Sequence, residues 1–306
     1  MSHLTPPLHG LVAATHTPFF SDGAINFGMV ETQASHLIKT QVPTAFIGGS
    51  TGESSSLTVT ERLALADRWF EVAKGTSLNI VVHVGANCLA DSRALAAQAE
   101  KLGAAAISAV SPSYFKPRSV EVLIDCAAAI AAAAPGTPYY HYDIPALTGI
   151  NLPIAEFLAK APARIPTLAG IKFTNPDLMA YQFCLRVDGG AWDLPWGVDE
   201  HMLGALAMGA RGAVGSGFNF AAPIYHRLMA AFAAGDLAAA REEQFRGVQL
   251  IQLFAGLGYM AAAKACMKML GVDVGPARLP NSNLTAEQTK KLHADLEAMG
   301  FFEWVK

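Results

Sequence analysis

The fold is decided by a short apolar run, Gly170-Ile171-Lys172-Phe173-Thr174, which is followed by the turn residues Asn175-Pro176-Asp177. Such a run, closed by Asn, Pro and Asp, is typical of a strand. Apart from one lysine it is continuously apolar rather than alternating, as expected for a strand that helices cover on both faces. We therefore expect a parallel sheet with Lys172 at the carboxyl end of a strand.

Seven similar runs occur elsewhere, so the sequence predicts eight strands. Their predicted bounds are 11–15, 45–49, 80–85, 105–110, 139–143, 169–174, 194–198 and 213–217. The intervals have room for one crossover helix each, and helical spacing is clear from Thr58 or Thr60, from Asp91, and over residues 120–134, 154–160 and 202–208. No Gly-x-Gly-x-x-Gly follows the first run, so the alternation favours a closed (β/α)8 barrel over a dinucleotide-binding sheet.

The pattern changes after Phe220, where helical spacing is no longer interrupted by strands. Helices are predicted at residues 223–234, 237–253, 261–270 and 285–299. We interpret the first as the last barrel helix. The predicted division is therefore a barrel at residues 1–235 and a C-terminal helical extension at residues 236–306, packed on the barrel as one structural unit.

The composition excludes several classes of protein. The 306 residues are 52% hydrophobic and 15% charged, against roughly 25% charged in an average soluble protein. This favours a large core, with further surface buried between subunits. The net charge is −3 and basic residues form no run, which argues against nucleic acid and anionic membranes as partners.

Cysteine usage and the N-terminus indicate a cytoplasmic protein. Cys88, Cys126, Cys184 and Cys266 are isolated and lack CxxC spacing, so we expect reduced, mostly buried thiols and no zinc site. Residues 1–10 have no apolar segment typical of a signal peptide. No stretch reaches the ~18 uninterrupted apolar residues of a membrane span.

Lys172 is the first candidate for chemistry. Burial at a strand end disfavours the ammonium form of a lysine, and a neutral amine attacks a ketone to form a Schiff base. The alternative, on this segment alone, is a lysine whose amine extends to solvent.

Active sites of barrels lie at the carboxyl ends of the strands, and the other predicted ends carry suitable groups. Gly48-Gly49-Ser50-Thr51-Gly52-Glu53 combines glycines with two hydroxyls and predicts a loop that binds a carboxylate or phosphate. The alternative is an ordinary turn. Tyr142 ends another strand and supplies a phenol, although a tyrosine there can be a buried anchor.

Two further ends are polar. Asp199 and Glu200 form an acidic pair that could accept hydrogen bonds from sugar hydroxyls, or simply cap a helix. Ser216 and Thr174 supply hydroxyl groups. Because no cluster of metal ligands is visible, the set favours an aldolase with a lysine nucleophile over a metal-dependent one.

Three motifs together resemble a known family. Gly48-Gly49-Ser50-Thr51-Gly52-Glu53, Tyr142-Asp143-Ile144-Pro145 and Gly170-Ile171-Lys172-Phe173-Thr174 are similar, in order and strand placement, to signatures of the N-acetylneuraminate lyase and dihydrodipicolinate synthase superfamily. The likeness extends from about Leu8 to Pro280 and is strongest to the lyase branch. Synthases carry an arginine where this chain has Leu147. Asp143 departs from the family, which has Asn or His there.

The resemblance implies a mechanism without a cofactor or metal. Lys172 would form a Schiff base with open-chain N-acetylneuraminate, and Tyr142 would move the proton that accompanies carbon–carbon cleavage to N-acetylmannosamine and pyruvate. Ser50 and Thr51 would hold the substrate carboxylate. The residues implied to bind the sugar hydroxyls are Thr174, Gly197, Asp199, Glu200 and Ser216.

The family also implies a homotetramer. Tyr114 lies in a segment from which relatives often supply a tyrosine to a neighbouring subunit's site. Two alternatives stay open at this point. One is a related pyruvate-dependent aldolase or dehydratase that acts on a different sugar acid. The other is a non-catalytic barrel that binds a keto acid and regulates a partner, because a fold does not imply a function.

Overall fold

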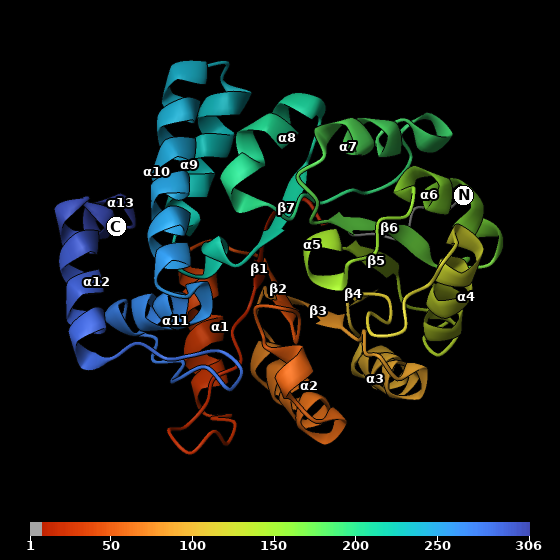
Figure 1. Cartoon of the computed structure of the whole chain (residues 1–306), viewed down its shortest axis with the longest axis horizontal. Coiled ribbons are helices and arrows are strands. Elements are labelled where there is room, and N and C mark those ends of the chain that lie inside the picture. The colour runs from red at the N-terminus through yellow and green to blue at the C-terminus, as the bar shows by residue number, and fades with distance from the viewer. Residues whose placement is uncertain (1–7) are drawn as a thin grey trace.

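Seven parallel strands form the centre of the molecule in the computed structural model, which describes residues 8–306 (Figure 1). The strands are β1 Gly10–Ala14, β2 Thr44–Ile47, β3 Asn79–His83, β4 Ala106–Ala109, β5 Tyr139–Asp143, β6 Leu168–Phe173 and β7 Gly212–Gly215. They are hydrogen-bonded in the order β6-β5-β4-β3-β2-β1-β7, so that β1 pairs with both β2 and β7. The sheet therefore curls round, and only the space between β6 and β7 is left to fill.

The prediction of a strand at residues 194–198 is wrong. The segment nevertheless lies between β6 and β7 and fills the space between them. Trp196 forms isolated parallel bridges with Phe173 of β6 and Ala213 of β7. Gly197 donates its N–H to the carbonyl of Phe173 at 2.7 Å. Pro195 has no N–H to donate, which prevents a regular ladder. The result is a nearly closed barrel of the predicted (β/α)8 class.

The other seven predicted runs are confirmed as strands, with ends that shift by at most two residues. β2 stops at Ile47 because Gly48 has a φ of 64°, in the left-handed region. β7 stops at Gly215 because residues 217–219 form a 3-10 turn. At both early stops the backbone turns at the carboxyl end of the barrel and forms hydrogen bonds with side chains, at the Gly48 carbonyl and the Gly217 N–H.

Helices surround the strands in the alternation that the sequence predicts. They are α1 Met29–Lys39, α2 Val59–Ala73, α3 Leu89–Leu102, α4 Val120–Ala131, α5 Pro145–Thr148, α6 Ile154–Lys160, α7 Leu178–Cys184, α8 Met202–Met208 and α9 Ala222–Ala233. Of these, α1, α5 and α7 are additional to the predicted helices. The buried face of α1 includes Gln33, whose amide donates to the carbonyl of His16 at 2.9 Å, and this polar residue interrupts the apolar spacing.

The predicted start of α2 is confirmed at Thr58. The Thr58 hydroxyl accepts a hydrogen bond from the Glu61 N–H at 3.2 Å, and the Glu61 carboxylate accepts one from the Thr58 N–H at 2.8 Å. This capping box satisfies two donors at the helix start. Arg278 near the C-terminus donates to the same carboxylate at 3.0 Å, so the cap of a barrel helix also binds the C-terminal segment.

The last part of the chain is helical, as predicted. It comprises α10 Leu237–Gly256, α11 Tyr259–Met269, α12 Ala286–Ala298 and α13 Phe301–Trp304. In Figure 1, α10 runs beside α9, and α12 lies on the outer edge of the molecule. The chain bends by 117° between α10 and α11. The division after residue 235 falls between α9 and α10 and stays a prediction.

Within residues 8–306, no single helix is both long and apolar enough to cross a membrane. Helices α10 and α11 reach that length and composition only as a pair, across their sharp bend.

The interior of the barrel is packed at its amino end and polar at the other. Leu8, Val12, Val81 and Val214 belong to a buried cluster inside the strands. Below them, the Asp193 carboxylate accepts hydrogen bonds from the Leu8 N–H at 2.6 Å and from the Tyr140 hydroxyl at 2.7 Å. These contacts close the bottom of the barrel, which leaves the carboxyl ends of the strands as the open end.

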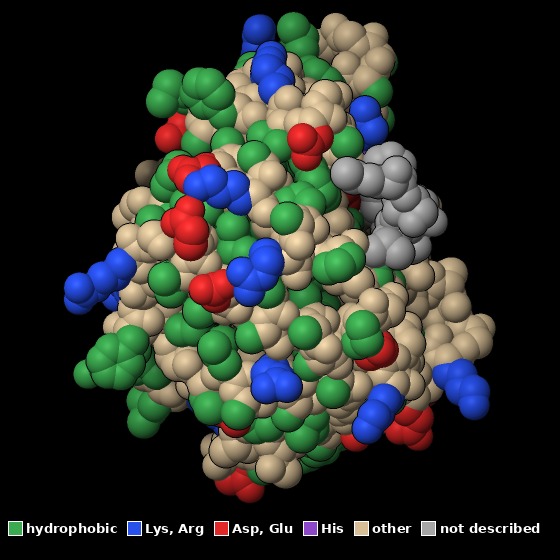
Figure 2. Space-filling view, turned by 90° about the vertical axis from the view of Figure 1, so that its right-hand side faces the viewer, with side chains coloured by type: hydrophobic (Ala, Val, Ile, Leu, Met, Phe, Trp, Pro, Cys, Tyr) green, Lys and Arg blue, Asp and Glu red, His purple; other side chains and the backbone are tan. Residues whose placement is uncertain are grey.

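The outer surface carries charges of both signs. Figure 2 shows, on the side that lies at the right of Figure 1, acidic and basic side chains interspersed with hydrophobic ones. Lys160 of α6 pairs with Glu121 of α4 at 2.8 Å, and Arg164, just beyond α6, pairs with Asp125 of α4 at 3.1 Å. These side chains are largely exposed, so each pair contributes little to stability.

Closure of the barrel depends on close contact between the backbones of Gly170 and Asp193. Replacing Gly170 tests this contact. A Cβ at Gly170 would collide with the carbonyl oxygen of Asp193, which accepts a hydrogen bond from Ile171. We expect Gly170→Ala to lower the free energy of unfolding by about 1–3 kcal/mol, because the backbone must shift. A lower urea midpoint measures this.

The control is Gly256→Ala at the end of α10, where a Cβ meets nothing within 4 Å. It should change stability by less than about 1 kcal/mol. Equal midpoints for the two variants would contradict the assigned contact between β6 and the 193–197 segment.

Candidate active site

The Lys172 amine lies inside the open end of the barrel. The side chain is 3% exposed, and Nζ is 3.8 Å from the ring centre of Tyr142 on β5 and 4.2 Å from that of Phe46 on β2. The position is therefore as predicted, at a strand end and buried. The two aromatic rings shield the amine from water on the sides that they cover.

Tyr142 links the amine to the loop that follows β2. Its ring is buried, and its hydroxyl is 3.4 Å from the Ser50 hydroxyl. The rings of Phe46 and His83 both meet it edge-on, with centroids 6.0 and 5.8 Å away. Sequence reasoning missed Phe46 and His83, because only the register of the closed barrel shows that they point inward beside Lys172.

His83 supports this arrangement as a neutral ring. Burial, with a further contribution from Arg62, lowers the pKa of His83 well below its usual value. Its Nδ1 is 2.9 Å from the carbonyl oxygen of Gly48, so we assign the proton to Nδ1, which donates to that carbonyl. Arg62 in turn donates to the His83 carbonyl at 2.7 Å. The start of the loop after β2 is thereby fixed.

The loop itself is stabilised by its own backbone. The N–H of Glu53 donates to the Ser50 carbonyl at 3.0 Å, and that of Ser54 donates to the Gly49 carbonyl at 3.2 Å. Ser50 is exposed and Thr51 is half-buried. Hydroxyls on a tight, glycine-rich turn beside a buried amine are suited to hold a small carboxylate.

Thr174 and Gly197 lie next to each other across the gap that the 193–197 segment fills. A Cβ at Gly197 would collide with the Thr174 side chain, so only glycine fits at this position. The Thr174 hydroxyl is buried and has no hydrogen-bond partner among residues 8–306. A buried hydroxyl without a partner requires an explanation. A polar ligand bound at the open end would be the missing hydrogen-bond partner.

Asp199 is the buried member of the acidic pair. Its carboxylate accepts a hydrogen bond from the Gly217 N–H at 2.8 Å, and a Cβ at Gly215 would collide with it. Burial, with a smaller contribution from the charge of Glu200, raises the pKa of Asp199 to about 7. Near neutral pH this group can therefore both donate and accept hydrogen bonds. Glu200 beside it is half-buried.

Ser216 brings in a residue that sequence reasoning missed. Its hydroxyl is 2.7 Å from the hydroxyl of Tyr259, at the start of α11. Burial raises the pKa of Tyr259 well above its usual range, so this phenol stays protonated. No sequence signal could have placed Tyr259 here, because only the packing of α11 brings it to the barrel.

Tyr114 is not part of this arrangement within one chain. It lies between β4 and α4, is 79% exposed and packs against the ring of Phe115 with centroids 5.1 Å apart. Its N–H donates to the Asn87 side chain at 3.0 Å. Its predicted role therefore depends on a neighbouring subunit.

Other predictions about the site have mixed outcomes. All four cysteines are free, but the expectation of mostly buried thiols is only half right, because Cys88 is exposed and Cys126 is half-buried. Over the described range 8–306, no group of three or more His, Cys, Asp or Glu side chains is arranged to hold a metal ion.

Comparisons with known proteins agree with the fold and with the motifs. A model of the dihydrodipicolinate synthetase family matches residues 7–299. An N-acetylneuraminate lyase A of Xenopus laevis is 41% identical over 276 residues, covering 89% of this chain and 90% of the relative.

Two solved structures are similar over nearly the whole chain. The N-acetylneuraminate lyase of Proteus mirabilis has a TM-score of 0.93 and 40% identity, covering 96% of this chain and 99% of that protein. The N-acetylneuraminate lyase (sialic acid aldolase) of Aliivibrio salmonicida has a TM-score of 0.93 and 41% identity, with 96% and 97% covered.

The raised pKa of Asp199 predicts a specific pH dependence of stability. An aspartate has an ordinary pKa of 3.8, and that of folded Asp199 is about 7. Between these values the folded state binds the proton more strongly than the unfolded state, so the free energy of unfolding falls as pH rises. Wild type should therefore lose stability relative to Asp199→Asn over this window, by an amount on the order of a few kcal/mol.

Urea unfolding of both proteins from pH 4.5 to 7.5 measures the difference. Other titrating groups are common to both proteins and cancel. A difference that stays constant with pH would show that Asp199 does not titrate there.

Proposed function

The chain belongs to the dihydrodipicolinate synthetase family, and we propose that it is a Schiff-base aldolase that reversibly cleaves N-acetylneuraminate to N-acetylmannosamine and pyruvate. The relatives that it resembles over nearly their full length carry the name of this lyase. The observation that carries the proposal is the buried Lys172 amine, 3.8 Å from the Tyr142 ring centre at the open end of the barrel.

The first step is formation of the imine. The Lys172 amine attacks the keto carbon of the open-chain sugar acid, and the keto oxygen leaves as water. The resulting iminium carries a positive charge. It withdraws electrons from the neighbouring carbon–carbon bond without any metal or cofactor.

Cleavage then moves one proton and one electron pair. Tyr142 accepts the proton of the hydroxyl beyond the bond that breaks and passes its own proton to the substrate's carboxylate. The bonding electrons move to the iminium and leave an enamine of pyruvate, while N-acetylmannosamine departs as the aldehyde. Protonation of the enamine and addition of water release pyruvate and regenerate Lys172. The positive charge of the adjacent iminium assists the proton transfer through Tyr142.

Two sets of groups orient the substrate. Ser50 and Thr51 hold its carboxylate, which fixes the angle at which the keto carbon meets the amine and supplies a proximity effect. The groups that we propose for the sugar hydroxyls are Thr174, Gly197, Asp199, Glu200 and Ser216. The unpartnered Thr174 hydroxyl and the protonatable Asp199 support this assignment.

We further propose that the protein is a cytoplasmic homotetramer in which Tyr114 reaches a neighbour's site. Large hydrophobic side chains are exposed on the single chain, among them Tyr114, Phe115, Leu147, Met179 and Phe183. Exposed apolar groups mark a contact surface where they are contiguous, as the rings of Tyr114 and Phe115 are. The four free cysteines are consistent with a reducing compartment.

Reductive trapping tests the covalent step. Incubation with pyruvate and borohydride should add one reduced pyruvate to the protein, and peptide mapping should place it on Lys172. Lys172→Ala should fold normally and lose turnover by a factor of at least about 10³, because no other group forms the iminium. An adduct at a different lysine, or activity retained in the variant, would reject the mechanism.

Substrate preference separates the lyase from a related aldolase. N-acetylneuraminate should be cleaved with a kcat/KM at least about 100-fold above that of 2-keto-3-deoxy sugar acids, because hydroxyl-binding groups left unpaired penalise shorter substrates. Release of pyruvate measures both. A higher rate with the shorter acids would favour the aldolase of different specificity, and no release with any substrate would favour the non-catalytic barrel.

A further inference from the structure

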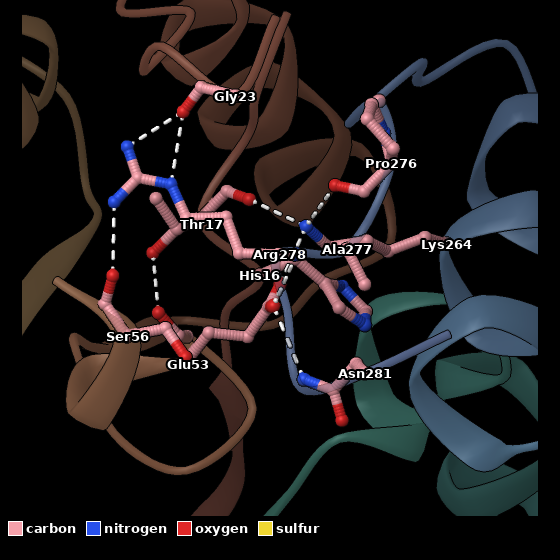
Figure 3. Close-up of polar contacts among 12 residues, drawn as sticks. His16, Thr17, Gly23, Glu53, Ser56, Lys264, Pro276, Ala277, Arg278 and Asn281 are labelled. Atoms are coloured by element: carbon pink, nitrogen blue, oxygen red, sulfur yellow. Dashed lines mark hydrogen bonds and ion pairs between the residues drawn. The ribbon is translucent and has the colours of Figure 1, made fainter. Parts of the chain in front are cut away.

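Glu53 ends the loop after β2 that carries Ser50 and Thr51, and its side chain is buried. It points into a buried cluster that the C-terminal part of the chain completes (Figure 3). Its φ of 54° lies in the left-handed region, which few residues other than glycine adopt. A carboxylate that is almost completely buried must be paired, so its partners decide whether the loop can hold this conformation.

Lys264 of α11 is the charged partner. Its Nζ lies 2.7 Å from Oε1 of Glu53, and both side chains are almost fully buried. The contact is an ion pair by distance, although its angle does not make a well-aligned hydrogen bond. Lys264 also donates to the carbonyl oxygens of Thr17 and Pro276, each at 2.9 Å. Two N–H bonds of the ammonium group are therefore directed at these carbonyl oxygens, while its charge lies beside the Glu53 carboxylate.

The second carboxylate oxygen binds the C-terminal segment. Oε2 of Glu53 accepts hydrogen bonds from the Arg278 N–H at 2.9 Å and from the Asn281 side chain at 3.2 Å, as Figure 3 shows for Asn281. Burial, with the charge of Lys264, lowers the pKa of the neighbouring His16 to about 3. That ring is therefore uncharged and does not compete with Lys264 for Glu53.

The same contacts reach the exposed side of the loop. The Glu53 N–H donates to the carbonyl of Ser50 at 3.0 Å, and the Thr17 hydroxyl donates to the carbonyl of Gly52 at 2.6 Å. Thr17 thus connects Lys264 to the loop. Its side chain donates to the loop, and its backbone carbonyl accepts from Lys264. A rotation of Glu53 out of the cluster would pull on Ser50 directly through this backbone bond.

We propose that the Glu53–Lys264 ion pair positions the Ser50–Thr51 turn to receive the carboxylate of the keto acid. The inference rests on the proposed function, because it assigns a role in substrate binding to that site. Both residues are positioning residues, since they act on the turn through each other, through Thr17 and through the C-terminal segment. Through this pair, the helical C-terminal part of the chain sets the geometry at which the barrel binds its substrate.

Glu53→Gln tests the pair with little change of shape. The probes are pyruvate and methyl pyruvate, which has the same ketone but no carboxylate charge. The second-order rate of borohydride trapping at Lys172 should fall about tenfold for pyruvate, because the charge-assisted contact to its carboxylate loses its alignment. The rate for methyl pyruvate should change less than about twofold, since the amine and Tyr142 are untouched.

Glu243→Gln is the matched control. Glu243 is a buried carboxylate on α10 that pairs with Arg227 on α9 at 2.9 Å and with Arg246 at 2.6 Å. Its loss also takes the carboxylate partner from positive charge, here on the partly exposed Arg227 and Arg246, but far along the chain from the Ser50–Thr51 turn. It should lower the melting temperature and leave both trapping rates within about twofold of wild type, because stability rather than the site is affected.

Each outcome decides the inference. Equal falls for both probes would show a general loosening of the site and overturn the proposal, as would unchanged rates in Glu53→Gln. If that variant does not fold, the double variant Glu53→Gln with Lys264→Met leaves neither charge unpaired, and it should show the same selective loss for pyruvate. If wild type is not trapped by pyruvate, the proposed function fails and this inference with it, whereas trapping without selectivity rejects the inference alone.

Discussion

The site depends on one constraint, which is that an amine must be held almost fully buried at the open end of a barrel. The strands around Lys172 satisfy it by placing the rings of Phe46 and Tyr142 on its flanks, while Leu8, Tyr140 and Asp193 close the barrel below it. A regular eighth strand is replaced by a segment containing Pro195 and Gly197. This segment seals the wall by single bridges and leaves the Thr174 hydroxyl without a partner in the described chain.

The sequence predicted those parts of the structure that depend on the local pattern of residues. Continuous apolar runs located seven strands, and the Thr58 cap and the α8 bounds followed from local signals. The motif residues Ser50, Tyr142 and Lys172 converge as expected, because parallel strands end on the same side of a barrel. The interpretation of residues 194–198 as a strand was wrong, since hydrophobicity alone does not reveal the lost donor of Pro195.

What could not be predicted comes from contacts between residues far apart in the sequence. Tyr259 meets Ser216 only because α11 folds back over the barrel, and Lys264 finds Glu53 for the same reason. Nothing in the local sequence distinguishes His83 and Phe46 from other strand residues. Only the register of the strands shows that both face the inside of the barrel. Buried polar pairs of this kind have no periodic signature, so their positions emerge only from tertiary packing.

The hydrogen bond between Tyr259 and Ser216 has a consequence for engineering. The barrel looks separable, because its last helix ends at Ala233 and a short turn leads into α10. An excised barrel, even one that is soluble, would nevertheless lack a phenol at the rim where β7 ends. Directed evolution toward new sugars should therefore randomise α11 together with the strand ends, instead of regarding the tail as inert scaffold.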